Sequence, residues 1–277
     1  MDLKLNNRTA LVSGSAKGIG LAIATTLAGE GARVIVTGRS KTSVVIAQDE
    51  IRKQFPEASL DGFAGDLADA AAVLELVGRF PTVDILVNNL GIYEPKPFEE
   101  IPDEDWLRFF EINVMSGVRL SRAYLPQMKE RNWGRIVFIS SESAIQIPTE
   151  MIHYGMTKTA QLAISRGLAE TCAGTGVTVN AVLPGPTRSA GVEEFVSRLS
   201  AGKPFEEFER EFFKNIRPTS LLQRFAAPEE VASLVAFLCS RSHPQPTALR
   251  CGSMAEWSSR VFNRNPVNSK EGRLGAR

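Results

Sequence analysis

Short apolar runs alternate along the chain with longer stretches in which apolar residues recur every three or four positions. The short runs are apolar on both faces and predict strands at Thr9–Val12, Arg33–Val36, Asp84–Val87, Ile136–Ile139 and Val177–Leu183. The longer stretches predict amphipathic helices at Leu21–Leu27, Val44–Phe55, Ala70–Phe80, Trp106–Met128 and His153–Ala173. This alternation is typical of the α/β class, with helices on both faces of a doubly wound parallel sheet.

The alternation continues without an internal repeat or a proline-rich linker, which predicts a single domain over residues 1–240. Residues 190–218 interrupt it with a looser, polar segment that contains two short helical stretches. We expect this segment to act as a lid over a substrate.

Charge and cysteine content narrow the classes of partner. The formal net charge is +1, from 32 basic and 31 acidic residues, so we expect neither nucleic acid nor a membrane surface as a partner. Cys172, Cys239 and Cys251 are scattered without CxxC spacing, which favours a reducing compartment and no metal site. No signal peptide and no run of about 20 apolar residues is present, and the sequence predicts a cytoplasmic protein.

A tyrosine and a lysine stand four residues apart, at Tyr154 and Lys158 in HYGMTK, and Ser141 ends the apolar run RIVFISS. That spacing places both side chains on one helix face, about 5–6 Å apart at Cβ. Tyrosine titrates near 10 unless a fixed positive charge lowers its pKa, and Lys158 can supply that charge. A lone YxxxK pair is more often part of an ordinary amphipathic helix with a surface tyrosine and lysine.

Three glycines, Gly14, Gly18 and Gly20, follow the first predicted strand and open a helix in SGSAKGIG. Glycine allows a tight turn and a close approach of the backbone to a pyrophosphate, and a helix N-terminus supplies free N–H groups. The spacing differs from GxGxxG, and a glycine-rich turn without a ligand is the alternative. The position after the first strand favours a dinucleotide site in a Rossmann-like domain.

The motifs GxxxGIG, NNLG at residues 88–91, Asn113, Ser141, YxxxK and PGPT at residues 184–187 occur in this order. Their order and spacing resemble the short-chain dehydrogenase/reductase family, and in particular bacterial members of the oxoacyl-carrier-protein reductase type. The resemblance covers residues 5–238. It implies an oxidoreductase acting on a carbonyl or secondary alcohol, and a homodimer or homotetramer.

The resemblance also implies roles for four residues. Tyr154 would exchange a proton with the substrate oxygen while a nicotinamide exchanges hydride with its carbon. Lys158 would hold the nicotinamide ribose and lower the Tyr154 pKa, Ser141 would bind the substrate oxygen, and Asn113 would anchor a proton-relaying water. The rival interpretation is a nucleotide-binding sensor or interaction protein that retains the fold without turnover.

The charged residues near the end of the second predicted strand indicate whether the site prefers NADP(H) or NAD(H). The second predicted strand ends in VIVTGRS, so Gly38 and Arg39 stand where NAD-selective members carry a carboxylate, and Lys17 lies in the glycine turn. Two cations favour a 2′-phosphate, and we expect NADP(H) to be preferred, with NAD(H) as an alternative. The resemblance implies further cofactor contacts at Gly14, Ser15, Lys17, Gly18, Ile19, Gly20, Asp66, Leu67, Asn88, Gly91, Tyr154, Lys158, Pro184, Gly185 and Thr187. For Asp66, a helix N-cap is the competing interpretation.

The substrate end of the site is expected to involve residues 142–151, Tyr93, Glu94 and the segment 190–218. Its mixture of apolar and acidic side chains predicts a medium-sized carbonyl or alcohol that is not strongly anionic. His153, which precedes Tyr154, is predicted to form part of the pocket wall.

The resemblance stops after Leu238, where family members have a last strand of the kind GAALRVDGG. Back-translation of residues 240–258 one base out of register permits SPLASATNGAALRVDGGVV, and the same register permits a stop codon across Phe262 and Asn263. We hypothesise that one base near Ser240 is missing relative to the family's gene. Residues 241–277 would then be an aberrant, largely disordered tail, with the last strand lost or replaced by Thr247–Cys251.

Restoring one base near Ser240 in the coding sequence should open the reading SPLASATNGAALRVDGGVV. We expect the repaired chain to melt at least about 2–4 °C higher, the shift that roughly 1 kcal/mol gives in a domain of this size. We also expect it to form a stronger oligomer by size-exclusion chromatography with light scattering. No such open reading, or equal melting temperature and assembly, would contradict the hypothesis.

Overall fold

The computed structural model describes residues 3–189, 204–240 and 250–252, and its centre is a parallel β-sheet. The strands are β1 (Thr9–Val12), β2 (Arg33–Gly38), β3 (Leu60–Ala64), β4 (Ile85–Asn88), β5 (Gly134–Ile139), β6 (Val177–Leu183) and β7 (Arg250–Gly252). They pair in the order β3-β2-β1-β4-β5-β6-β7, every pair parallel. The predicted doubly wound α/β fold is confirmed.

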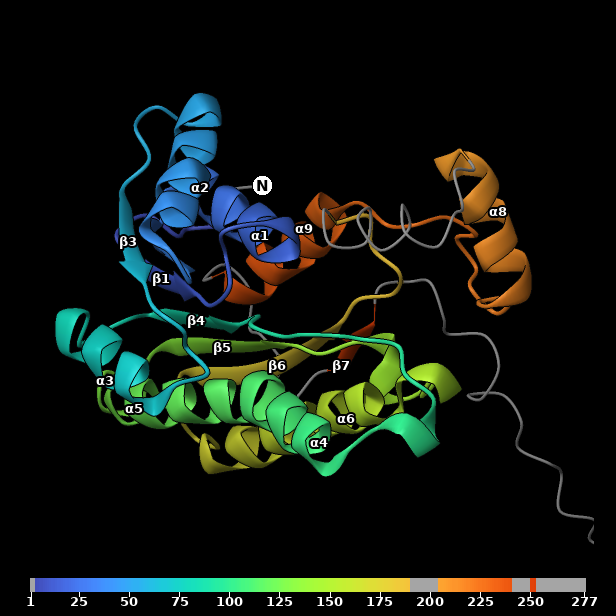
Figure 1. Ribbon diagram of the computed structural model, residues 1–277. Helices are drawn as coiled ribbons and strands as arrows, with labels where there is room; N and C mark the ends of the chain where they lie inside the picture. Colours follow the sequence, from blue (N-terminus) through green and yellow to red (C-terminus); the bar gives the residue numbers. More distant parts are fainter. Residues whose placement is uncertain (1–2, 190–203, 241–249, 253–277) are drawn as a thin grey trace, which may run out of the picture.

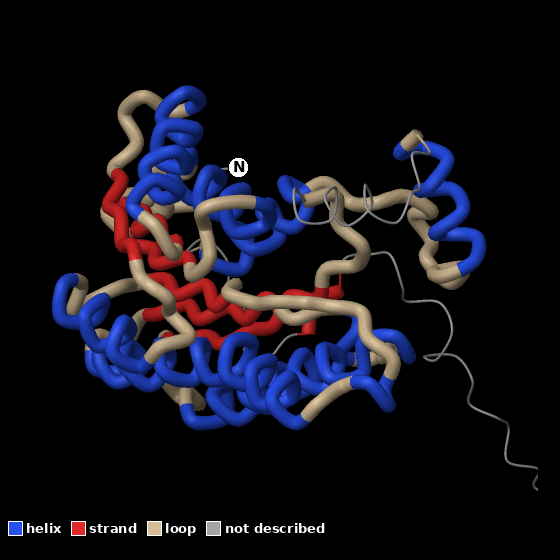
Figure 2. The backbone as a smooth tube through the Cα atoms, viewed as in Figure 1, coloured by secondary structure: helices blue, strands red, loops and turns tan. Residues whose placement is uncertain are grey.

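Helices form a layer on each side of this sheet (Figures 1 and 2). One layer holds α1 (Gly18–Gly29), α2 (Lys41–Gln54) and α9 (Pro228–Cys239), and the other holds α3 (Ala70–Arg79), α4 (Asp103–Phe110), α5 (Ser116–Glu130) and α6 (Ile152–Thr171). A further helix, α8 (Phe205–Asn215), stands apart from both layers. Within the described ranges, no helix has the length and apolar character needed to cross a membrane.

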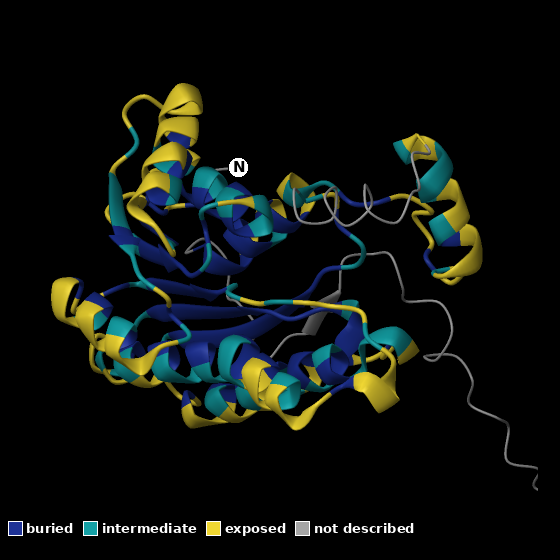
Figure 3. Ribbon diagram, viewed as in Figure 1, coloured by how far each residue is buried: buried dark blue, intermediate teal, exposed yellow. Residues whose placement is uncertain are grey.

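The core is divided by the sheet into two apolar clusters, because successive strand residues point to opposite faces. In β1, Ala10 and Val12 pack toward the layer of α1, α2 and α9, while Leu11 packs toward the layer of α3 to α6. Both faces of the central strands are therefore buried, as Figure 3 shows. This explains why their sequences are apolar at every position instead of every second one.

The predicted helix Trp106–Met128 is helical throughout, but it contains a π-helical turn. The structure has α4, a π-helical turn at Glu111–Met115, and then α5. A π turn inserts one residue into the helical repeat, and a single shift of this size is not recognisable in the apolar pattern of the stretch. Such turns are frequent at functional sites, and this one contains Asn113.

The last strand is short. In the described residues β7 pairs through Arg250–Gly252 with Ala181–Leu183, the carboxyl half of β6. This strand overlaps the expected replacement at Thr247–Cys251, of which residues 247–249 lie outside the described part. Most of the expected disordered tail, at 241–249 and 253–277, and residues 190–203 of the expected lid also lie outside it.

Candidate active site

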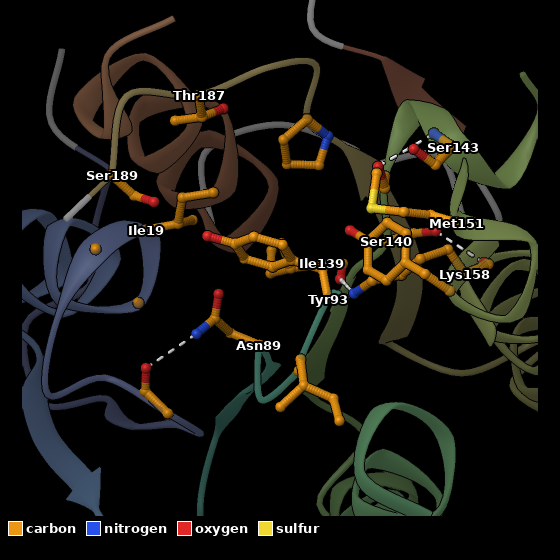
Figure 4. A pocket seen from close by; sticks show the side chains of 18 of the residues that line it. Ile19, Asn89, Tyr93, Ile139, Ser140, Ser143, Met151, Lys158, Thr187 and Ser189 are labelled. Carbon is orange, nitrogen blue, oxygen red and sulfur yellow. Dashed lines mark hydrogen bonds between the residues drawn. The ribbon is translucent and has the colours of Figure 1, made fainter. Parts of the chain in front are cut away.

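A large cleft opens at the carboxyl ends of the central strands, with a volume of about 1310 Å³. The sheet order reverses between β1 and β4, so the loops after these two strands diverge and leave a crevice between them. In Figure 4, Ile19, Thr187 and Ser189 lie on one side of the cleft, and Ser143, Met151 and Lys158 lie on the other. The volume suffices for a dinucleotide together with a small substrate.

The glycine turn forms the floor at one end of the cleft. Gly14 and Gly18 have φ of +63° and +59°, the left-handed conformation that favours glycine. A Cβ atom on Gly20 would lie 2.4 Å from the Gly14 carbonyl oxygen and 2.5 Å from Asn89 Nδ2. Helix α1 begins here without a side-chain N-cap, so its first N–H groups face the cleft. This geometry fits the pyrophosphate of a dinucleotide.

Ser15 does not line the cleft in the described structure, although the sequence predicted a cofactor contact there. It is buried beneath the turn, where its Oγ donates to the Val12 carbonyl at 2.8 Å and accepts from the Thr37 N–H at 2.8 Å. Its hydroxyl therefore ties the turn to β1 and β2. Its contribution is to the shape of the glycine turn.

Cationic and hydroxyl side chains gather where β2 ends. Arg39 and Lys17 line the cleft, with Ser40 and Ser43 beside them. Ser40 caps α2, since its Oγ accepts from the Ser43 N–H at 3.2 Å. These two serines were missed from sequence, although a serine that precedes a helical pattern is a recognisable N-cap signal.

Asp66 and Leu67 line the opposite wall of this end of the cleft, after β3. The alternative interpretation of Asp66 as a helix N-cap is wrong. Asp66 Oδ1 accepts from the Ala68 N–H at 3.0 Å in a local turn, whereas Asp69 caps α3 by accepting from the Ala71 N–H at 2.9 Å. Both aspartates occur in GDLAD, and only the backbone decides which one stands at the N-cap.

Tyr154 and Lys158 lie next to each other on α6, facing the cleft. Lys158 Nζ is 5.6 Å from the centroid of the Tyr154 ring. Ser141 lines the cleft beside them and lowers the pKa of the Tyr154 hydroxyl. Ser141 follows β5, so its hydroxyl enters the cleft from the sheet while Tyr154 enters from the helix. The structure therefore brings together the three residues that the sequence grouped.

Burial dominates the titration of this pair. It raises the pKa of Tyr154 to about 12, with a lowering contribution from the Ser141 side chain and smaller raising contributions from Glu142 and Tyr93. It lowers the pKa of Lys158 to about 7. The ammonium is partly compensated by the Ile139 carbonyl, to which Nζ donates at 2.9 Å. Lowering of the Tyr154 pKa by Lys158 stays a prediction.

Asn113 is buried behind the pair, in the π turn, and does not line the cleft in the described structure. Its Oδ1 accepts from the Ile92 N–H at 2.7 Å, and its Nδ2 donates to the Ile92 carbonyl and to Thr157 Oγ1, each at 3.0 Å. Thr157 in turn donates to the Tyr154 carbonyl at 2.7 Å. The side chain thus connects the loop after β4 to the start of α6.

Two other predicted positions need correction. Asn88 is buried and donates to Ser121 Oγ at 3.1 Å, and its neighbour Asn89 lines the cleft instead. The end of β4 places alternate side chains on opposite faces, which sequence alone did not resolve. His153 is no part of the cleft wall, because it is buried against Phe109 with ring centroids 4.0 Å apart.

The remaining predicted cofactor residues do line the cleft. They are Ile19, Gly91, Pro184, Gly185 and Thr187. A backbone hydrogen bond fixes the PGPT segment, since the Ala226 N–H donates to the Pro186 carbonyl at 2.9 Å. The segment therefore forms a fixed wall between the glycine turn and the Tyr154 end.

An ion pair closes the far end of the cleft. Arg217, just after α8, donates from Nε to Glu142 Oε1 at 3.3 Å and lies 3.5 Å from Glu150. The Arg217 and Glu142 side chains are only 12% and 10% exposed, so water screens this pair weakly. Together with Tyr93, they surround the side of the cleft beyond the Tyr154 hydroxyl.

Comparison with known proteins gives a consistent family. The short chain dehydrogenase profile matches residues 8–199. The oxidoreductase YvaG of Bacillus subtilis is 52% identical over 242 residues, which cover 87% of this chain and 92% of that protein. The D-beta-hydroxybutyrate dehydrogenase of Cupriavidus necator is 33% identical over 247 residues, which cover 87% of this chain and 94% of that enzyme.

Solved structures share the fold. L-Sorbose reductase from Gluconobacter frateurii, complexed with NADPH and L-sorbose, superposes with a TM-score of 0.84 at 28% identity, covering 92% of this chain and 98% of its own. A 3-oxoacyl (acyl-carrier-protein) reductase from Agrobacterium tumefaciens with NADP bound gives a TM-score of 0.83 at 29% identity, covering 92% of this chain and 96% of its own.

The change Gly20→Ala should force the glycine turn apart, because its Cβ would lie 2.4 Å from the Gly14 carbonyl oxygen. Overpacking costs about 1–3 kcal/mol, so we expect an affinity for NADPH that is roughly 5- to 150-fold weaker by calorimetric titration. The matched control is Gly167→Ala on α6, where nothing lies within 4 Å of the added Cβ. The control should bind NADPH normally and gain about 0.5–1 kcal/mol of stability. Unchanged NADPH affinity in Gly20→Ala would contradict the placement of phosphates on this turn.

Proposed function

Because this chain belongs to the short chain dehydrogenase family, we propose that it transfers hydride between NADP(H) and a carbonyl or secondary alcohol, with Tyr154 as the general acid and base. The observation that carries the proposal is the meeting of Tyr154, Ser141 and Lys158 in the cleft that also contains the glycine turn. The names of its relatives and structural neighbours, which include dehydrogenases and NADPH-bound reductases, support the same reaction class.

The proton steps follow from the positions of the side chains. When bound, the nicotinamide supplies the hydride for the carbonyl carbon. Ser141 donates a hydrogen bond to the carbonyl oxygen and fixes it beside Tyr154, which gives up its phenolic proton to the forming alkoxide. In the oxidation direction Tyr154 takes that proton back. Glu142 and Tyr93 line the same cleft and act on the Tyr154 hydroxyl.

The high pKa of Tyr154 suits the reduction direction, because a phenol near 12 keeps its proton at neutral pH and remains a stronger acid than the alcohol formed. The reverse direction needs a tyrosinate. We propose that the ammonium of Lys158 stabilises that anion, so the reaction requires Lys158 in its charged form. Asn113 supports the same arrangement by anchoring the start of α6 and, as the family resemblance implies, a proton-relaying water.

The cofactor is proposed to lie along the cleft with its pyrophosphate on Gly14, Gly18 and Gly20. The other contacts follow from the lining of the cleft: Lys17, Arg39, Ser40 and Ser43 for a 2′-phosphate; Asp66 and Leu67 for the adenine; Ile19, Gly91, Pro184, Gly185 and Thr187 for the nicotinamide half. Two cations and two hydroxyls at the end of β2 favour NADP(H) over NAD(H). Lys158 would additionally hold the nicotinamide ribose.

The substrate is proposed to be a medium-sized, uncharged carbonyl or alcohol. Arg217 is paired with Glu142 and Glu150, so it is not available to hold a substrate carboxylate. Phe212 and Ile147 supply an apolar wall. We propose that α8 and the ion pair after it form part of a lid over this end.

We also propose a homodimer or homotetramer in the cytoplasm. The family resemblance supports assembly, and the few scattered cysteines support a reducing compartment. The domain itself is proposed to comprise residues 1–240.

The change Tyr154→Phe removes the proton donor and leaves the cleft otherwise intact. We expect kcat for carbonyl reduction to fall by at least about 10²–10⁴-fold, the range attributed to general acid-base catalysis. NADPH affinity, measured by fluorescence titration, should change by less than about twofold. The matched control is Tyr93→Phe, since the Tyr93 ring lies 6.4 Å from that of Tyr154 in the same cleft.

The assay follows NADPH oxidation over a panel of ketones and oxoacyl thioesters. Surviving activity in Tyr154→Phe would reject Tyr154 as the acid and base. NADPH binding by the unmodified chain without turnover of any panel member would favour the rival function, a nucleotide sensor or interaction protein.

The change Arg39→Ala removes a charged donor at the proposed 2′-phosphate site. A hydrogen bond to a charged group contributes about 1.5–3 kcal/mol, so we expect kcat/KM for NADPH to fall by roughly 10- to 100-fold while kcat/KM for NADH stays within about twofold. Arg52→Ala on the exposed side of α2 is the control. Equal losses with both nucleotides would show that Arg39 only stacks on the adenine, and no loss with either would show that it faces solvent.

A further inference from the structure

Gln161 is a buried glutamine one helical turn beyond Lys158 on α6, with 2% of its surface exposed. Its Nε2 donates to the backbone carbonyl oxygen of Asn113 at 2.6 Å. Its Oε1 accepts from Lys158 Nζ at 3.4 Å. One amide group therefore bridges a carbonyl in the π turn and the ammonium group in the cleft.

The chemistry of the two partners determines the orientation of this amide. The Asn113 carbonyl can only accept a hydrogen bond, so the atom that faces it must be the NH₂ group. The Lys158 ammonium can only donate, so the atom that faces it must be the amide oxygen. A flipped amide would set a donor against a donor and an acceptor against an acceptor. A glutamine is thus the neutral side chain that satisfies both neighbours.

We propose that Gln161 is a positioning residue, which holds the Lys158 ammonium and the Asn113 carbonyl in register for proton transfer at Tyr154. The inference rests on the proposed function, since it concerns the same proton path. Gln161 is not in the lining of the described cleft, so it acts through Lys158 and Asn113 and not by touching the substrate.

The hydrogen bonds of Lys158 show what the position requires. An ammonium has three N–H donors. One is directed to the Ile139 carbonyl at 2.9 Å and a second to Gln161, which leaves one for the side of the cleft that holds Tyr154. Without the Gln161 oxygen a second donor would lose its acceptor, and the ammonium would be free to rotate away from a productive position.

Gln161 also favours the charged form of Lys158. Burial lowers the pKa of Lys158 to about 7, and an acceptor for the ammonium opposes that shift. Around Lys158 in the described part of the chain, Tyr154 is the titratable neighbour on α6, while β5 and the π turn present the neutral Ile139 and Asn113. Glu142 acts on Tyr154 from the turn after β5. The Gln161 oxygen is therefore a neutral acceptor that favours the charged form of Lys158.

The alternative is that Gln161 only fills space between α6 and the π turn. Two variants distinguish these roles. Gln161→Met keeps an unbranched side chain of similar size and removes both hydrogen bonds, and Gln161→Glu places a carboxylate beside the ammonium. The matched control is Gln127→Met on α5, a partly buried glutamine away from the cleft.

The first measurement is the Lys158 titration in the nucleotide-free protein, followed through its Nζ by ¹⁵N NMR and assigned with Lys158→Arg. We expect Gln161→Met to lower the Lys158 pKa by about one unit and Gln161→Glu to raise it by at least about one unit. Gln127→Met should leave it unchanged. This readout needs no turnover, so it tests Gln161 even if no panel substrate is reduced and the proposed function fails.

The second measurement is the pH profile of kcat/KM for NADPH, which reports the free enzyme. If charged Lys158 is required, activity falls as the pH rises through its pKa. The basic limb should therefore move to lower pH in Gln161→Met and to higher pH in Gln161→Glu, and kcat at the optimum should fall about tenfold in Gln161→Met. A Gln161→Met variant that matches Gln127→Met in the titration and the profile would overturn the inference, even if its melting temperature is lower.

Discussion

The parallel pairing of β1 with β4, and of β4 with β5, is the constraint on which the candidate site depends. Three carboxyl ends meet at one edge of the sheet, and each continues into a segment that lines the cleft. The glycine turn follows β1, Asn89 follows β4, and Ser141 follows β5. Residues far apart in sequence thus converge because hydrogen-bonded strands cannot shift in register without exposing apolar side chains on both faces of the sheet.

Burial is the main electrostatic influence on this site. It disfavours charge on both Tyr154 and Lys158, so it moves their pKa values in opposite directions, to about 12 and about 7. Groups that accept hydrogen bonds from the Lys158 ammonium therefore oppose the effect of burial on its pKa. The Ile139 carbonyl and the Gln161 amide are two such groups, and both come from rigid elements, a strand and a helix. An environment of this kind can adjust proton affinity through small changes in hydrogen bonding.

Periodicity and motif order predicted the fold class and most of the cleft lining, because strands buried on both faces and a glycine turn have strong local signals. The features that sequence did not reveal depend on geometry. The π turn lies within a stretch whose apolar pattern looks like that of one helix. Whether Asn88 or Asn89 lines the cleft depends on which face of β4 each side chain occupies. In the sequence, Gln161 is a polar residue within a helical pattern and carries no functional signal. Its amide has two partners only because the π turn packs against α6.

The carboxyl half of β6 pairs with a short β7, so this edge of the sheet differs most from the expectation drawn from the family.

Hydride transfer in the cleft can be followed with an isotope label on the nucleotide. The chain would be incubated with NADPH carrying deuterium at both C4 positions and with a panel of ketones, and the products would be examined by mass spectrometry. We expect a secondary alcohol with one deuterium on the carbinol carbon, formed in equal amount to the oxidised nucleotide. Nucleotide bound in the cleft with no deuterated alcohol from any ketone, or alcohol formed without deuterium, would contradict hydride transfer in this cleft.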